Sequence, residues 1–234
     1  MPWGSALTWL EIFIILLIID SVVELALISR MVAWLNRTAS QSVWHFTFGG
    51  EMYSVSGLPE KLLLDQGHAS NGAAGTAAIV AGLGGVLALW LRRISDRRGG
   101  RSKVAAFGRW LYYMWLVLSI PALLLTTGAF AYVFAVTNSR ARQRIDPLAA
   151  ASHNGTDLYP LLSWTPQNWF SAVLRLELVQ RRSEIQKQLA VMKGWQYNLI
   201  AMFLIQLCQT VLAGVEHFSW QRHWKQTVTH TTAA

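Results

Sequence analysis

The sequence predicts an all-α membrane protein in which four transmembrane helices form a bundle. Three observations support this prediction. Four apolar stretches each reach the length of about 20 residues that a helix needs to cross the hydrocarbon core of a bilayer. Charged residues make up 14% of the 234-residue chain, whereas soluble domains carry about 25%. Many of the 12 tryptophans stand at the ends of the apolar stretches, where amphipathic rings prefer the headgroup level.

The four spans belong to one membrane domain, residues 1–234. They are expected at about residues 12–31, 73–91, 110–137 and 197–215. The first lacks a basic segment before it, so it is interpreted as a retained span rather than a signal peptide. The third has no charged residue between Arg109 and Arg140. It is therefore longer than a bilayer requires, and we expect this helix to tilt or protrude, with a tolerated kink at Pro121.

The loop at 92–109 is short and holds seven Lys and Arg residues against one acid, Asp96. Short basic loops stay in the cytoplasm. Both termini are therefore expected inside, and the loops at 32–72 and 138–196 are expected outside or in a lumen. The membrane is either the plasma membrane or an endomembrane.

Two glycosylation sequons agree with this orientation. Asn36 and Asn154 each begin an Asn-x-Thr sequence in a predicted outer loop, so the chain is predicted to be a glycoprotein. Arg30 stands at the end of the first span and Arg37 follows it, and these two charges favour the opposite orientation locally.

The first outer loop is expected to contain a small β-hairpin. Residues Val43 to Phe48 alternate in polarity, Gly49-Gly50 follow, and a second short strand runs from Glu51 to Val55. Two such strands around a Gly-Gly pair are typical of a hairpin. Beyond it, residues 58–64 are predicted to form a helical turn on the membrane surface.

The second outer loop is expected to contain an amphipathic helix. Thr165 suits an N-cap and Pro166 suits the first helical position. Apolar residues then recur at helical spacing, and the pattern resumes at Ile185, Leu189 and Met192 toward the fourth span. This helix either binds a membrane surface or partner, or caps the bundle.

Asp20 and Glu24 are the main candidates for chemistry. They lie four residues apart near the centre of the first span, where each ionised carboxylate costs about 2.5–3.5 kcal/mol. They can form a proton or cation site or a catalytic acid/base pair. Alternatively, they belong to a buried hydrogen-bond cluster that orients the helix. His68 is a further catalytic candidate.

Other residues of the spans are predicted to pack helices. Small residues spaced by four let helices approach closely, and amides form bonds between helices. The residues concerned are Ala74, Ala78, Gly82, Gly85, Asn198, Gln206 and Gln209.

The chain lacks the sequence motifs of several classes of enzymes and metal-binding proteins. The chain contains no HExxH, CxxC, P-loop or GxSxG sequence, and its six histidines are scattered, so no metal site and no cofactor is expected. With one cysteine, Cys208, an intrachain disulfide is impossible. The net charge of +8 lies beside apolar stretches, which favours membrane lipids rather than nucleic acid as the partner.

The expected architecture resembles that of claudins and tetraspanins, although the outer loops lack the cysteine pairs of those families. Three segments are similar to those of uncharacterised fungal four-span integral membrane proteins. They are TPQNWF at 165–170, MKGW at 192–195 and DQGH at 65–68. This resemblance implies topology but no activity.

Two main hypotheses on function remain open, beside a third with less support, a small ion pathway that oligomers form with Asp20 and Glu24. The first is a non-enzymatic scaffold or assembly protein that binds a protein partner or further copies of itself. The second is a membrane enzyme or carrier for a lipophilic metabolite, in fungal secondary metabolism for example, that uses Asp20 and Glu24. Whether the chain is an enzyme is therefore undecided from the sequence.

Overall fold

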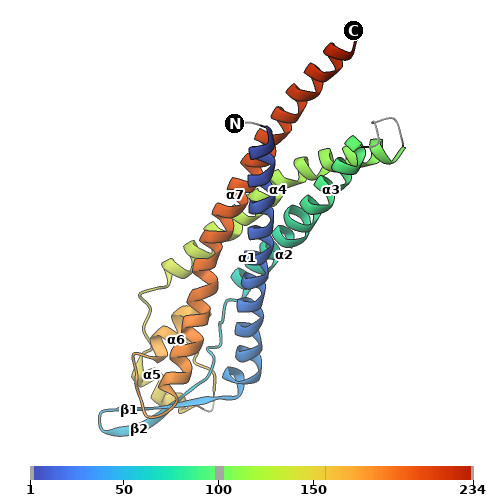
Figure 1. Ribbon diagram of the computed structural model, residues 1–234. Coiled ribbons are helices and arrows are strands. Elements are labelled where there is room, and N and C mark those ends of the chain that lie inside the picture. The colour runs from blue at the N-terminus through green and yellow to red at the C-terminus, as the bar shows by residue number, and fades with distance from the viewer. Residues whose placement is uncertain (1–2, 98–102, 156, 233–234) are drawn as a thin grey trace. The chain divides into compact units, whose positions relative to one another are not determined.

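The computed structural model describes residues 3–97, 103–155 and 157–232. They fold mostly into helices with a small antiparallel sheet, which confirms the helical architecture and the hairpin (Figure 1). Among these residues, four helical stretches are long and apolar enough to cross a membrane: Ala6–Gln41, Asp65–Ser95, Lys103–Ser139 and Arg182–Arg222.

Helices and strands follow one another in a simple order. They are α1 (Trp3–Arg37), η1 (Ala39–Gln41), β1 (Val43–Phe48), β2 (Glu51–Ser56), α2 (Asp65–Thr76), η2 (Ala77–Leu83), α3 (Gly84–Arg97), α4 (Lys103–Ser139), α5 (Pro147–His153), α6 (Pro166–Val173), β3 (Glu177–Leu178) and α7 (Arg182–Thr232). Two compact units result. Unit 1 contains Met1–Val23, Gly72–Gly128 and Ile200–Ala234, and unit 2 contains Glu24–Asn71 and Ala129–Leu199.

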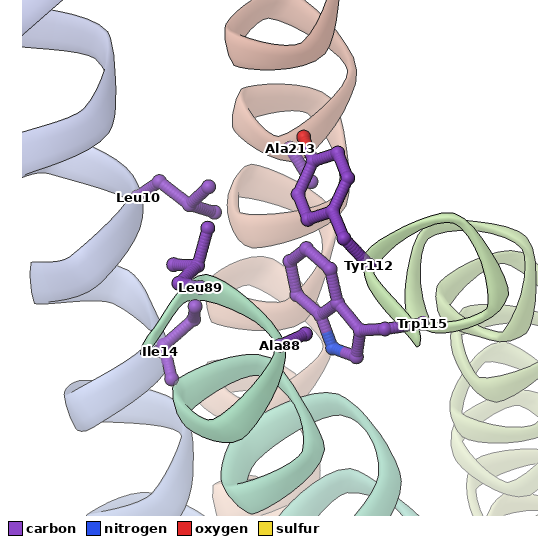
Figure 2. Close-up of a cluster of buried hydrophobic side chains, with 7 residues drawn as sticks. All are labelled: Leu10, Ile14, Ala88, Leu89, Tyr112, Trp115 and Ala213. Atoms are coloured by element: carbon purple, nitrogen blue, oxygen red, sulfur yellow. The ribbon is translucent and has the colours of Figure 1, made fainter. Parts of the chain in front are cut away.

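Unit 1 has an apolar core to which α1, α3, α4 and α7 all contribute (Figure 2). Its members are Leu10, Ile14, Ala88, Leu89, Tyr112, Trp115 and Ala213. Small residues on α3 and α7 alternate with large rings on α4, and this alternation lets side chains from different helices interdigitate.

A seven-residue π-helix, η2, interrupts the second candidate span. A π-turn displaces carbonyls from the regular hydrogen-bond pattern of an α-helix. One of them, Ala81 O, accepts a hydrogen bond of 3.1 Å from the Trp115 indole nitrogen of α4. The ring approaches this closely because Gly85 has no side chain, since a Cβ there would lie 2.9 Å from Trp115 Cζ2.

The sheet of unit 2 has the strand order β2-β1-β3. β1 and β2 pair from Val43↔Ser56 to Phe48↔Glu51. Their turn residues Gly49 and Gly50 both have positive φ, 61° and 88°, as a type I′ hairpin requires. On β1, Trp44 and Phe46 are buried, so the strand presents one face to the interior of the unit.

An aromatic cluster from α6 and the segment before it also contributes to this interior. The Trp164 and Trp169 ring centroids lie 5.3 Å apart, and the Tyr159 and Trp169 centroids lie 5.6 Å apart. The Trp169 indole donates to Gly57 O at 2.9 Å. Burial raises the pKa of Tyr159. At the start of α6, the Thr165 hydroxyl accepts from Asn168 N, as predicted for an N-cap.

Two local predictions differ from the structure. Residues 58–64 form no helical turn, because their backbone pairs with the later segment through the bridges Pro59↔Tyr159 and Leu62↔Trp164. The predicted amphipathic helix of the second outer loop is divided in two. α6 ends at Val173, β3 and a turn follow, and α7 then runs from Arg182 through the whole of the fourth candidate span.

Candidate functional site

Glu24 is the most completely enclosed of the predicted catalytic candidates. It lies in unit 2 and is fully buried. Its Oε1 accepts a hydrogen bond of 2.7 Å from the Ser70 hydroxyl of α2. Its Oε2 accepts one of 3.0 Å from the Asn198 amide of α7. The carboxylate therefore joins three helices within this unit.

The sequence places Glu24 there through the helical period of α1. Glu24, Ile28, Met31 and Leu35 recur every three or four residues, and all four are buried, which is the pattern of a helix face turned inward. A carboxylate on such a face needs hydrogen-bond donors, since an unpaired buried charge is very costly. Ser70 and Asn198 supply these donors.

The other catalytic candidates have different surroundings. Asp20 belongs to unit 1 and is partly buried. His68 is exposed on α2 and lines a groove of unit 2 that neither Asp20 nor Glu24 lines. Among the described residues, no group of three or more His, Cys, Asp or Glu side chains is arranged to hold a metal ion.

Unit 1 contains a second buried polar cluster. The Arg92 guanidinium of α3 donates to both carboxylate oxygens of Glu216 on α7, at 2.7 and 2.6 Å. The Tyr112 hydroxyl of α4 donates to the same carboxylate at 2.7 Å. Exposed fractions of 2% for Arg92 and 0% for Glu216 place this bidentate pair outside the reach of solvent.

Aromatic rings complete the enclosure of Arg92. Its Cζ lies 4.5 Å from the ring centroid of Tyr112 and 5.4 Å from that of Trp220, both within the range of cation–π attraction. The ring of His217 also packs on Tyr112 at 5.9 Å. Charge, hydroxyl and rings thus tie α3, α4 and α7 of unit 1 together.

This cluster is not predicted by the sequence pattern. The pattern places Arg92 in the basic loop at 92–109, and that assignment is wrong because α3 extends to Arg97 and Arg92 is buried. A usable signal is nevertheless present. The buried stripe of small residues at Ala81 and Ala88 continues at helical spacing to Arg92, and Glu216 supplies the opposite charge on the last span.

The amides of the fourth span have separate roles. Gln206 is fully buried in unit 1, where its Oε1 accepts a 2.6 Å bond from Thr126 of α4. Gln209 is also fully buried, and its Nε2 has no hydrogen-bond partner among the described residues. Asn198 is the residue of this group that binds a carboxylate.

The small residues of the second span lie at close helix contacts in unit 1. Ala74 and Ala78 are buried. A Cβ on Gly82 would lie 2.5 Å from Ile18 Cγ1, and one on Gly85 would meet the Trp115 ring. The two glycine positions therefore have no room for a larger side chain unless a neighbour moves.

Both glycosylation candidates are exposed in unit 2. Asn36 lies in the last turn of α1. Asn154 caps the end of α5 with φ 42°, and its Oδ1 accepts a hydrogen bond from the Ser54 hydroxyl at 3.0 Å.

The chain matches no protein-family model, and no curated protein or solved structure is significantly similar to it.

Proposed function

We propose that this chain is a four-span integral membrane protein that acts without catalysis, as a scaffold or assembly partner. The closed state of its two best-buried carboxylates carries the proposal. Glu24 is bonded at both oxygens by Ser70 and Asn198, and Glu216 is held by Arg92 and Tyr112. Such contacts join helices and leave these two carboxylates no open surface for a substrate.

The β-hairpin of unit 2 is the surface proposed for partner binding. Phe48 and Met52 flank its turn with 39% and 66% of their surface exposed. Their side chains point to opposite faces of the hairpin, because Phe48 pairs with Glu51 and Met52 pairs with Thr47, so a partner that covers both must enclose the tip of the hairpin. Neither residue lies in a helical stretch that is long and apolar enough to span a membrane, so their exposure is not that of a lipid-facing span.

Cross-linking in native membranes, followed by mass measurement after extraction in mild detergent, tests the scaffold role. Wild type should give a complex of fixed stoichiometry, with a second protein or with further copies. The double variant Phe48→Ser, Met52→Ser should revert to the monomer. Lys61→Gln, a polar position of the same unit outside the hairpin, is the matched control and should keep the complex. A wild-type chain that stays monomeric in its own membrane would end this proposal.

The second candidate function is a membrane enzyme or carrier for a lipophilic metabolite. Asp20 and Glu24, which first suggested this function, do not line the groove beside His68. Support for this function therefore comes from the groove itself. Whether the groove binds a small molecule therefore distinguishes this candidate function from that of a scaffold.

A further inference from the structure

Unit 2 contains a groove of about 660 Å³ between the last turns of α1, residues 58–64 and the start of α2. This volume lies within the range of about 300–1,000 Å³ found for small-molecule sites. Its walls are mainly aliphatic and include Val32, Ala33, Leu35, Leu62, Leu63 and Leu64.

The groove is elongated along α1. Lining residues extend from Ile28 to Arg37, a rise of about 13 Å at about 1.5 Å per helical residue. α2 runs beside this part of α1, since a Cβ on Gly67 would lie 3.9 Å from Met31 Cε. Arg37 therefore marks one end of the groove.

The other end of the groove is also polar. Ser70 of α2 bonds to Glu24, so the chain from Gly67 onward follows α1 back toward its middle. His68 and Asn71, which line the groove, consequently lie near the end opposite Arg37. Between the two ends the walls offer hydrocarbon.

Charge decides which head group suits the groove. Among the described residues that line it, Arg37 is the only Lys or Arg, and none is Asp or Glu. Its guanidinium is exposed and forms no ion pair or hydrogen bond with a described residue. A guanidinium binds a carboxylate through two parallel hydrogen bonds, so this end favours an anion with one charge.

The walls beside Arg37 determine the chemistry of the ligand next to its head group. Leu35, Leu62 and Leu63 line the groove, and so does the polar residue Asn36 next to Arg37. The ligand therefore meets mostly aliphatic walls once its head group is bound. A fatty carboxylate has one charge and one acyl chain, which suits a single guanidinium and a groove of about 660 Å³, whereas a glycerophospholipid brings two acyl chains and a larger head group.

We propose that this groove binds a long-chain carboxylate taken from the surrounding lipid phase. The carboxylate lies on Arg37, the first part of the chain lies along α1 as far as His68, and the rest of the chain, which is longer than the groove, stays in the lipid. Val32 of the first candidate span and Leu64 are 41% and 43% exposed and line the groove, so a ligand from the lipid phase would enter past apolar side chains. The proposal goes beyond a scaffold role and does not depend on partner binding.

Photolabelling of the purified full-length protein in detergent tests it. The probe is an octadecanoic acid that carries a diazirine. Wild type should be labelled within 28–37 and 58–71, and unlabelled octadecanoate should compete. Octadecanol, which has the same chain without the charge, should compete about tenfold less well, the ratio expected for one charge-assisted pair.

Matched variants locate the site. Arg37→Gln should lower labelling about tenfold, and Val32→Trp should abolish it by filling the groove. Arg30→Gln and Val22→Trp change exposed residues of α1 outside the groove and should label like wild type. Equal labelling of Arg37→Gln and Arg30→Gln would overturn the proposal. So would stronger competition by a phosphate-headed lipid than by the carboxylate.

Discussion

At the scale of single residues, two buried carboxylates are stabilised by different means. Glu24 accepts hydrogen bonds from two neutral donors, the Ser70 hydroxyl and the Asn198 amide. Glu216 accepts them from a charged guanidinium and a hydroxyl. The sequence indicated that Glu24 needed a partner and that Asn198 was available. It did not indicate Arg92, because a basic residue at the end of an apolar stretch has the same pattern whether it faces solvent or a distant acid.

Arg92→Met should destabilise the protein by about 3–5 kcal/mol, because it leaves Glu216 as an uncompensated buried charge. Thermal unfolding in detergent, followed by tryptophan fluorescence, measures this loss. Adding Glu216→Leu should restore most of the lost stability, since replacing both members of a buried pair with apolar groups is often neutral. Arg93, whose partner Glu11 is partly exposed, provides the control. Arg93→Met should change the unfolding temperature little, and an equal loss there would contradict the buried-pair explanation.

Glu24→Gln should retain nearly the wild-type unfolding temperature. The glutamine oxygen still accepts from Asn198, and its amide nitrogen can donate to the Ser70 hydroxyl, which also acts as an acceptor. Glu24→Ala should cost about 1–3 kcal/mol, because the fully buried Ser70 hydroxyl then loses the acceptor that Glu24 provides. A marked loss in Glu24→Gln would mean that the negative charge itself is required, and would favour a proton or cation site.

At the scale of elements, turns and caps were predictable because their signals are local. Gly49-Gly50 marked the hairpin, and Thr165-Pro166 marked the start of α6. Strand β3 was not predictable, since two residues gain strand structure only by pairing with β1. The π-turn of η2 was not predictable either. It is accompanied by a contact between Trp115 and Ala81, which are distant in the sequence.

Gly85→Ala should destabilise unit 1 by about 1–3 kcal/mol through overpacking. Its Cβ would meet the Trp115 ring, which cannot withdraw without losing its bond to Ala81. Gly75→Ala is the matched control in the same span, because nothing lies within 4 Å of its Cβ position. It should leave stability unchanged or slightly raised, as alanine favours helix more than glycine does. Comparing the two unfolding temperatures checks the prediction, which fails if both variants behave alike.

At the scale of the whole molecule, the four long helices followed from length and polarity alone. The partition into two units did not, because α1, α2, α4 and α7 each contribute residues to both. Helical periodicity identifies the buried face of each helix but not the helix it meets. The pairing of Arg92 with Glu216 and of Glu24 with Ser70 therefore needed the structure.

The orientation predicted from the basic loop places residues 92–109 and the second long loop on opposite sides of the membrane. The chain suits a test with single cysteines, since Cys208→Ser removes its one thiol. On that background, Lys103→Cys and Ser152→Cys introduce thiols at exposed positions. In sealed membrane vesicles, an impermeant maleimide should label one of the two before permeabilisation and the other only afterwards. The cytoplasmic thiol should be the one at Lys103, because short loops rich in Lys and Arg remain there. Labelling of both from the same side would exclude the four-span topology, and the reverse assignment would show that Arg30 and Arg37 determine the orientation instead.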